Sequence, residues 1–176
     1  MNASEVVPRV NADPAAFDFD AAFRAHYQRV ARVIARLVRD RARSEELAVE
    51  VFLKFWHSPR AHGDKAEAWL YRAAVRKALD ELRREHRRLR YERLAHATQP
   101  VSTPEDIRRS SEEQGRVRRV LASIDSRQAS LLILRADGLT YDELASALDL
   151  NPASIGTFIS RAQQAFRKEY TKRYGR

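Results

Sequence analysis

The stretch from Leu139 to Ala162, LTYDELASALDLNPASIGTFISRA, constrains the fold more than any other part of the chain. Thr140 and Glu143 have the spacing of a capping box, which opens a short helix. The apolar pattern is then interrupted at Asp149-Leu150-Asn151, and Asp tolerates the left-handed backbone that such a turn often needs. Asn151-Pro152 supplies the N-cap and first position of a second helix. Two helices joined by so short a turn indicate a helix-turn-helix.

The second of these helices has an unusual exposed face. Ile155, Ile159 and Ala162 recur at helical spacing and predict its buried stripe. The opposite face carries Ala153, Ser154, Thr157, Phe158 and Arg161. Residues at the start of such a helix enter the major groove, and the basic residues further along, such as Arg167, can neutralise phosphates. An ordinary helical hairpin with a basic end would show the same pattern.

Helical periodicity extends over the rest of the chain, and no strand pattern stands out. We predict helices from Phe17, after Ser44 as an N-cap, from about 66 to 94, over 105–124, and from a cap at Ser126 to Gly138. The segment ATQPVSTPED, from Ala97, has the composition of a linker. We therefore expect an all-α protein with two small helical domains on a flexible linker. We place a loose tail at 1–16, a first domain at 17–96, the linker at 97–111 and a second domain at 112–176.

The charge of the chain favours a polyanionic partner. Its formal net charge is +9 and its pI is near 10.3. The excess is concentrated, with nine Lys/Arg against four Asp/Glu in 69–96 and six against one in 155–176. The absence of cysteine excludes disulfides and thiolate metal sites and fits a cytoplasmic location. The five scattered His form no metal or catalytic motif, so we expect no metal, cofactor or enzymatic activity, and no run is long enough to span a membrane.

Two further helix faces are candidate interfaces. Arg76, Asp80, Arg83, Arg87 and Arg90 share one face of the long helix, which Arg84 and Arg88 widen; they can bind phosphates or form a solvated charged face. Trp69 and Tyr71 precede this face and can stack on unpaired bases, although core packing is favoured for Trp69. The helix after Ser44 presents Glu45, Glu46, Glu50 and Lys54, a mostly acidic face that fits a basic protein partner or solvent.

Three of these segments, in this order, resemble the extracytoplasmic-function (group IV) sigma factors of bacterial RNA polymerase. SEELAVEVFLKFW resembles region 2.2 of that family, AWLYRAAVRKALDELRRE regions 2.3 and 2.4, and GLTYDELASALDLNPASIGTFISRAQQAFRKEY region 4.2. The resemblance covers about Phe17 to Tyr170. It implies a promoter-specificity subunit in which region 2 binds the polymerase clamp coiled coil and opens the −10 element. Region 4 would bind the −35 element and the polymerase flap.

The resemblance also assigns roles to particular residues. The core polymerase-binding set is Glu45, Glu46, Glu50 and Lys54. The −10 set, which includes the loop that captures a flipped base, is His57, Arg60, His62, Trp69, Arg72, Arg76, Asp80, Arg83, Arg84 and Arg87. The −35 set is Tyr141, Asn151, Ala153, Ser154, Thr157, Phe158, Arg161 and Arg167. A sequestering anti-sigma factor is a common partner in the family.

The sequence departs from the family pattern at four positions. Val49 replaces a frequent Gln on the clamp-binding helix and Arg76 replaces the usual Asn, whereas Gly156 and Phe158 stand where Lys and Arg are frequent. We therefore expect apolar and shape readout of the −35 element. The alternative is a stand-alone helix-turn-helix regulator that binds DNA without polymerase.

Overall fold

The computed structural model describes residues 17–95 and 105–175, and over these ranges it is all-α, as predicted. The elements are α1 (Phe19–Ala35), α2 (Arg41–Trp56), the 3₁₀ turn η1 (Pro59–Ala61), α3 (Ala66–Ala95), α4 (Glu105–Ser123), α5 (Ser126–Ala136), α6 (Tyr141–Leu148), the 3₁₀ turn η2 (Pro152–Ser154) and α7 (Ile155–Tyr174). The tail predicted at 1–16 and part of the linker, 97–104, lie outside the described residues, and 105–111 are helical.

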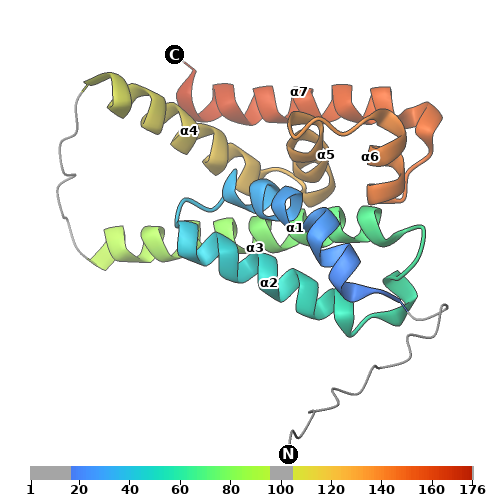
Figure 1. The fold of residues 1–176 in the computed structure, drawn as a ribbon. Coiled ribbons are helices and arrows are strands. Elements are labelled where there is room, and N and C mark those ends of the chain that lie inside the picture. The colour runs from blue at the N-terminus through green and yellow to red at the C-terminus, as the bar shows by residue number, and fades with distance from the viewer. Residues whose placement is uncertain (1–16, 96–104, 176) are drawn as a thin grey trace, which may run out of the picture.

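The helices form two groups that pack on each other (Figure 1). Helices α1, α2 and α3 make the first bundle, and α4 to α7 make the second, with α7 along its outer side. The long helix α3 belongs to the first bundle but also contacts α4, α5 and α6. The buried side chains consequently form one continuous apolar cluster through both groups, from Val30 to Ile159.

The helix-turn-helix is built as the sequence predicts. The Thr140 hydroxyl accepts from the Glu143 backbone N–H at 3.3 Å, and the Glu143 carboxylate accepts from the Thr140 N–H at 2.6 Å. Asp149 ends α6 with a left-handed φ of 54°. The Asn151 side chain accepts from the Ala153 N–H at 3.0 Å and starts the 3₁₀ turn before α7. These contacts fix the angle between α6 and α7.

Two predicted N-caps are wrong, because an aspartate upstream takes the role. Asp40 accepts from the Arg43 N–H at 3.1 Å, so α2 begins three residues before Ser44. Ser44 is buried within the helix and donates to the Arg41 carbonyl at 2.8 Å. Asp125, not Ser126, caps α5. In both cases good helix formers or small residues follow the aspartate and let the helix start there.

A buried carboxylate joins the two groups of helices. The Asp137 side chain, at the end of α5, is fully buried. Its Oδ1 lies 3.1 Å from Arg36 Nε and 3.3 Å from Arg32 Nε, and its Oδ2 lies 3.8 Å from Arg29 Nε. Arg29 also lies 4.0 Å from Glu143 on α6. We name the contact of Asp137 with these three α1 arginines the α1–α5 clasp.

We expect Asp137→Asn to destabilise the protein by about 1–3 kcal/mol, because three arginines lose the one carboxylate buried among them. The measurement is urea unfolding followed by circular dichroism. Asp142→Asn is the matched control, since Asp142 is exposed on α6 and makes no ion pair with a described residue. Equal stability of the two variants would contradict a role for the clasp.

The capping box predicts a pH dependence. The N–H of Thr140 donates to Glu143 and holds the pKa of that carboxyl below its usual 4.5, against the opposing effect of partial burial. A lowered folded-state pKa stabilises above pH 4.5, and this stabilisation is lost as the pH falls through the folded pKa. We expect Glu143→Gln to lower the free energy of unfolding by about 0.3–1 kcal/mol at pH 7. At pH 3 the difference in free energy of unfolding between the variant and the unsubstituted protein should shrink. An equal difference at both pH values would refute this account.

Candidate nucleic-acid and protein interfaces

The start of α7 presents most of its predicted reading face to solvent. Ala153, Thr157 and Arg161 are exposed, whereas Ser154 and Phe158 are half-buried. Phe158 packs partly against the core, so only part of its side chain is exposed. A Cβ built at Gly156 would meet only the Tyr141 ring, at 3.9 Å. The helix therefore offers a small, largely uncharged surface over its first two turns.

The remaining predicted −35 residues lie around this surface. Tyr141 is exposed, with the Arg135 guanidinium 5.5 Å from its ring centroid. Asn151 is exposed, but its side-chain oxygen is engaged in capping. Arg167 is exposed, six residues beyond Arg161 on α7, and also lines the large cavity among α4, α5 and α7. The arrangement places uncharged groups at the helix start and basic groups along its side.

The α3 face predicted for −10 contacts is only partly open. Arg76, Asp80, Arg84 and Arg87 are exposed, and Arg72 is half-buried. Arg83 differs from the others, because it is tied to the second group of helices. It donates to the Ala122 carbonyl at 3.1 Å, the Ile124 carbonyl at 3.2 Å and the Ser126 hydroxyl at 2.8 Å. In this arrangement Arg83 serves the contact between helix groups and is not available to DNA.

The aromatic residues near α3 are mainly structural. The prediction that Tyr71 stacks on bases is wrong: its ring is buried and its hydroxyl donates to Glu67 at 2.6 Å. Burial is the main cause that raises the pKa of this hydroxyl, followed by the bond to Glu67. Trp69 is half-buried, with its ring centroid 5.5 Å from that of Phe55, in line with the core packing favoured for it.

The loop predicted to capture a base lies between α2 and α3. His62 is held in place, since its Nε2 lies 2.9 Å from the Phe55 carbonyl and its ring stacks on Phe17 with centroids 3.7 Å apart. His57 is exposed, with its Nδ1 2.7 Å from the Leu53 carbonyl. Arg60 is exposed and makes no hydrogen bond or ion pair with a described residue. His62 is thus held against the core, whereas Arg60 at the tip of the loop is accessible.

The acidic face of α2 is largely neutralised by neighbouring cations. Glu45 pairs with Arg41 at 3.0 Å, and Glu46 pairs with Arg43 at 3.0 Å. Glu50 pairs with Lys77 and lies 3.5 Å from Arg43. Because these carboxylates already have cationic partners, the face attracts a basic protein less strongly than the sequence alone suggests.

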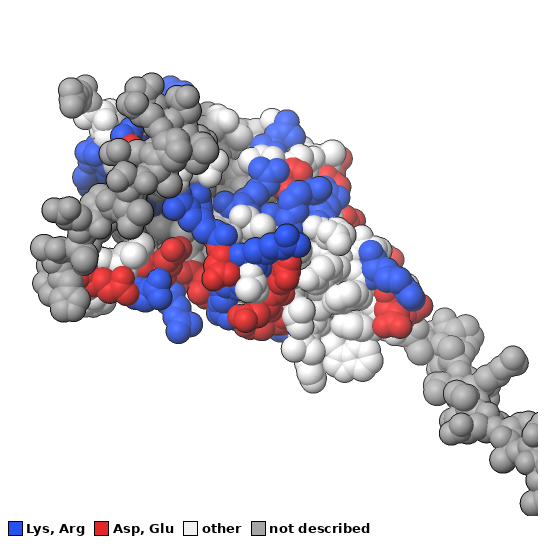
Figure 2. Space-filling model, turned by 60° about the vertical axis from the view of Figure 1, so that its left-hand side comes forward, with Lys and Arg blue, Asp and Glu red and all other residues white. Residues whose placement is uncertain are grey.

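A neighbouring apolar stripe on α2 was missed by sequence reasoning. Val49, Leu53 and Trp56 are 44%, 53% and 54% exposed, a large fraction for such side chains. They lie at i, i+4 and i+7, so they share one face. The signal was present in the sequence, as a second apolar stripe beside the core residues Leu47, Val51 and Phe55. The space-filling view shows interleaved basic and acidic side chains and, beside them, a contiguous area without charge (Figure 2).

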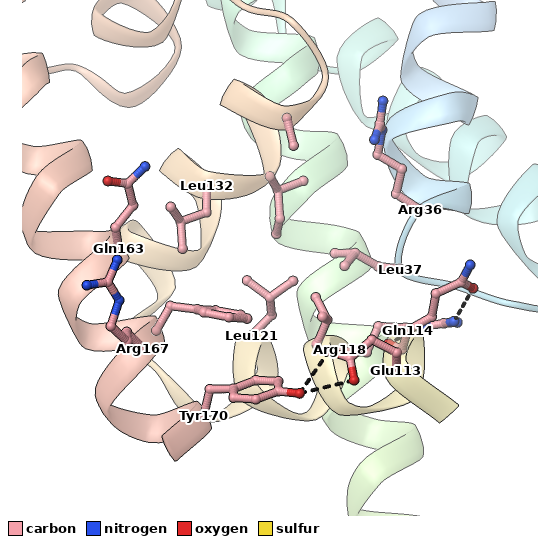
Figure 3. Close-up of a pocket in the computed structure, with 14 residues that line it drawn as sticks. Arg36, Leu37, Glu113, Gln114, Arg118, Leu121, Leu132, Gln163, Arg167 and Tyr170 are labelled. Carbon is pink, nitrogen blue, oxygen red and sulfur yellow. Dashed lines mark hydrogen bonds between the residues drawn. The ribbon is translucent and has the colours of Figure 1, made fainter. Parts of the chain in front are cut away.

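A cavity of about 960 Å³ opens among α1, α4, α5 and α7 (Figure 3). Its apolar lining is Leu37, Val117, Leu121, Leu132, Ile133, Ala136 and Phe166. Arg36, Arg118 and Arg167 supply positive charge around it. Across it the Tyr170 hydroxyl donates to the Glu113 carboxylate at 2.8 Å. The lining therefore combines apolar side chains with positively charged ones.

Over the described ranges, no group of three or more His, Asp or Glu side chains could hold a metal ion. None of the helices in those ranges is both long and apolar enough to cross a membrane.

Two helical units, one ending in a helix-turn-helix with a basic helix, are typical of DNA-binding proteins. Residues 22–88 match the family described as Sigma-70 region 2, and residues 114–165 match Sigma-70, region 4. A similar curated protein is the ECF RNA polymerase sigma factor SigK of Mycobacterium sp. (strain KMS), 30% identical over 145 residues that cover 78% of this chain and 75% of the relative. SigK of Mycobacterium tuberculosis (strain ATCC 25177 / H37Ra) is 30% identical over 164 residues, covering 88% and 84%.

Two solved structures share the fold. The sigma factor RpoE in complex with the anti-sigma factor NepR, from Bartonella quintana, has a TM-score of 0.51 at 17% identity, covering 86% of this chain and 96% of that one. CnrH in complex with the cytosolic domain of CnrY has a TM-score of 0.52 at 18% identity, covering 85% of each chain. The chain belongs to the sigma-70 family, among its extracytoplasmic-function members, and is a promoter-specificity subunit of RNA polymerase.

Proposed function

We propose that α2 and α3 bind core polymerase and the −10 element, while α4 to α7 bind the flap and the −35 element. The observation that carries this division is the order of the two matched regions, each with its own exposed candidate interface. Sigma factors are non-catalytic initiation factors, and we expect this chain to leave the chemistry to the polymerase.

For the polymerase clamp, we propose that the α2 apolar stripe supplies most of the binding free energy. Apolar side chains at the centre of an interface contribute more than charges that already have partners. Val49, Leu53 and Trp56 form this centre, and Glu45, Glu46, Glu50 and Lys54 surround it as a polar rim. On this account, the Val49 that replaces a frequent Gln strengthens the apolar character of the contact.

For the −10 element, the exposed arginines of α3 and the loop after α2 are the proposed contacts. Arg76, Arg84 and Arg87 face solvent in a row and can each contact a phosphate or a base edge. The rigid seat of His62 positions Arg60 at the loop tip, where a displaced base would be held.

For the −35 element, the uncharged start of α7 favours methyl and shape readout. Ala153 and the accessible side of Phe158 suit the thymine methyl, and Thr157 suits a base edge or a phosphate. The cavity bounded by α4, α5 and α7 is the proposed seat for a helix of the polymerase flap. An anti-sigma factor is a second candidate occupant, since RpoE is in complex with the anti-sigma factor NepR.

Promoter binding requires the two groups of helices to separate. The −10 and −35 elements lie about 25 base pairs apart, or roughly 85 Å at 3.4 Å per pair. Helix α3, the longest in the structure, spans about 45 Å at 1.5 Å per residue. The α1–α5 clasp and the hydrogen bonds of Arg83 must therefore break before both elements are bound, which releases Arg83 for DNA.

The test of this function is reconstitution of the full chain with core RNA polymerase from a related bacterium, followed by transcription-start mapping. We expect a stable complex and initiation at a defined promoter class. Failure to form any complex, together with specific nanomolar binding of the free chain to a duplex operator, would instead establish the stand-alone regulator.

We expect Leu53→Ala to weaken binding to core polymerase about tenfold, because an exposed apolar anchor at an interface contributes about 1–2 kcal/mol. The measurement is a titration of labelled core enzyme. Leu89→Ala is the matched control, as Leu89 is a similarly exposed leucine on α3, outside the α2 stripe. Equal effects of the two substitutions would exclude the stripe as the clamp contact.

We expect Phe158→Ala to change promoter choice, because it removes an apolar base contact. Arg167→Ala should weaken initiation at all promoters alike, because it removes a phosphate contact. Run-off transcription from a library of −35 sequences measures both. Unchanged preference in the Phe158 variant would assign that ring to the core alone.

A further inference from the structure

A second cavity, of about 330 Å³, lies between α3 and α4 beside the turn from α1 to α2. Its charged lining is unbalanced. It comprises four arginines, one histidine and one glutamate: Arg39, Arg90, Arg118, Arg119, His86 and Glu85. Arg118 also lines the larger cavity proposed for the flap, whereas Arg39, Arg90 and Arg119 belong to none of the sets assigned above to polymerase, promoter DNA or flap.

The guanidinium groups converge over a glycine. A Cβ built at Gly115 on α4 would lie 3.9 Å from Arg39 Nη2 and 3.7 Å from Arg119 Nη1. Both groups therefore border the same small space above the α4 backbone. Arg118 lies about one helical turn after Gly115 on α4 and also lines the cavity.

The hydrogen-bond partners of these arginines are all neutral. Arg39 donates to the Ser111 carbonyl at 2.9 Å, and Arg119 donates to the Tyr174 hydroxyl at 2.7 Å. Arg118 donates to the Gln114 side chain at 3.3 Å. Among the described residues, no carboxylate lies within ion-pair distance of these three groups or of Arg90. Burial, followed by the positive charge of Arg39, lowers the pKa of Arg118, against the opposing effect of the Glu85 carboxylate.

Like charges held together in a partly buried cavity raise its free energy until an anion enters. Arginine offers a planar set of N–H donors that matches phosphate oxygens, and several arginines together suit more than one phosphate group. The cavity is at the small end of ligand sites, which are typically about 300–1,000 Å³. Its charge, donors and size are those of a receptor for a compact, multiply charged anion.

We infer that this cavity binds a small polyphosphate anion, of which inorganic pyrophosphate is the simplest. Arg39 and Arg90 belong to the first group of helices, and Arg118 and Arg119 belong to the second. A bound anion bridges the two groups and favours their packed arrangement. This inference does not depend on the assignment of promoter contacts.

The test is calorimetric titration of the full-length protein with pyrophosphate at constant ionic strength. We expect a single saturable site whose dissociation constant rises at least tenfold in Arg118→Gln. Arg127→Gln is the matched control, because Arg127 is an exposed arginine outside the cavity whose side chain makes no hydrogen bond or ion pair with a described residue. It should bind as the unsubstituted protein does. Absence of saturation, or equal losses in both variants, would show only general attraction to a basic protein and overturn the inference.

A second variant keeps the test valid if Arg118→Gln fails to fold. Gly115→Ala places a methyl group between the guanidinium groups at ordinary contact distance, and Ala favours the helix. We expect this variant to be at least as stable to thermal unfolding as the unsubstituted protein and to bind pyrophosphate several-fold more weakly. Unchanged pyrophosphate binding would contradict the site.

The affinity for duplex DNA at the same ionic strength distinguishes the source of phosphate. If Arg118→Gln weakens DNA binding but not pyrophosphate binding, the cavity serves the DNA backbone and the inference fails.

Discussion

Across their apolar contact, the two groups of helices are also joined by a fully buried carboxylate, that of Asp137. It follows α5 and lies within ion-pair distance of Arg32 and Arg36, near the end of α1. Yet the clasp is not fully satisfied: Asp137 Oδ2 and Arg29 Nε are buried without a hydrogen-bond partner, since the 3.8 Å between them is too long. The desolvation of such a pair offsets much of its attraction, so the clasp specifies the packing more than it strengthens it.

Local chemistry explains which features were predictable from the sequence. The capping box, the left-handed Asp149 and the Asn151-Pro152 start depend on residues close in the chain, and all three have the predicted form. The caps at Ser44 and Ser126 were misplaced because Asp40 and Asp125 compete for the same role within a few residues. The role of Asp137 could not be predicted, because its partners lie about a hundred positions away and only the packing of the two groups of helices brings them together.

The candidate interfaces also divide into features that local sequence predicts and features that depend on tertiary packing. The arginine row of α3 follows from helical periodicity, and its members are exposed, except for Arg83. In the sequence Arg83 has the same spacing as the other arginines of the row. In the structure it donates hydrogen bonds to the carbonyls at the end of α4. Tyr71 is another such case, since a tyrosine before a basic helix fits base stacking until its burial is known. Periodicity indicates which residues share a face, whereas the partner of that face is a tertiary property.

The packed arrangement and the proposed function place opposite demands on the same contacts. Because both promoter elements cannot be reached at once while the groups are packed, part of the binding free energy of polymerase and promoter must drive separation. The three clasp arginines are 30%, 58% and 44% exposed at their side chains, so water can replace Asp137 around them at modest cost. An interface with a fully desolvated, fully bonded ion pair would resist separation more. The incomplete clasp therefore suits a subunit that is packed when free and must extend when it binds promoter DNA.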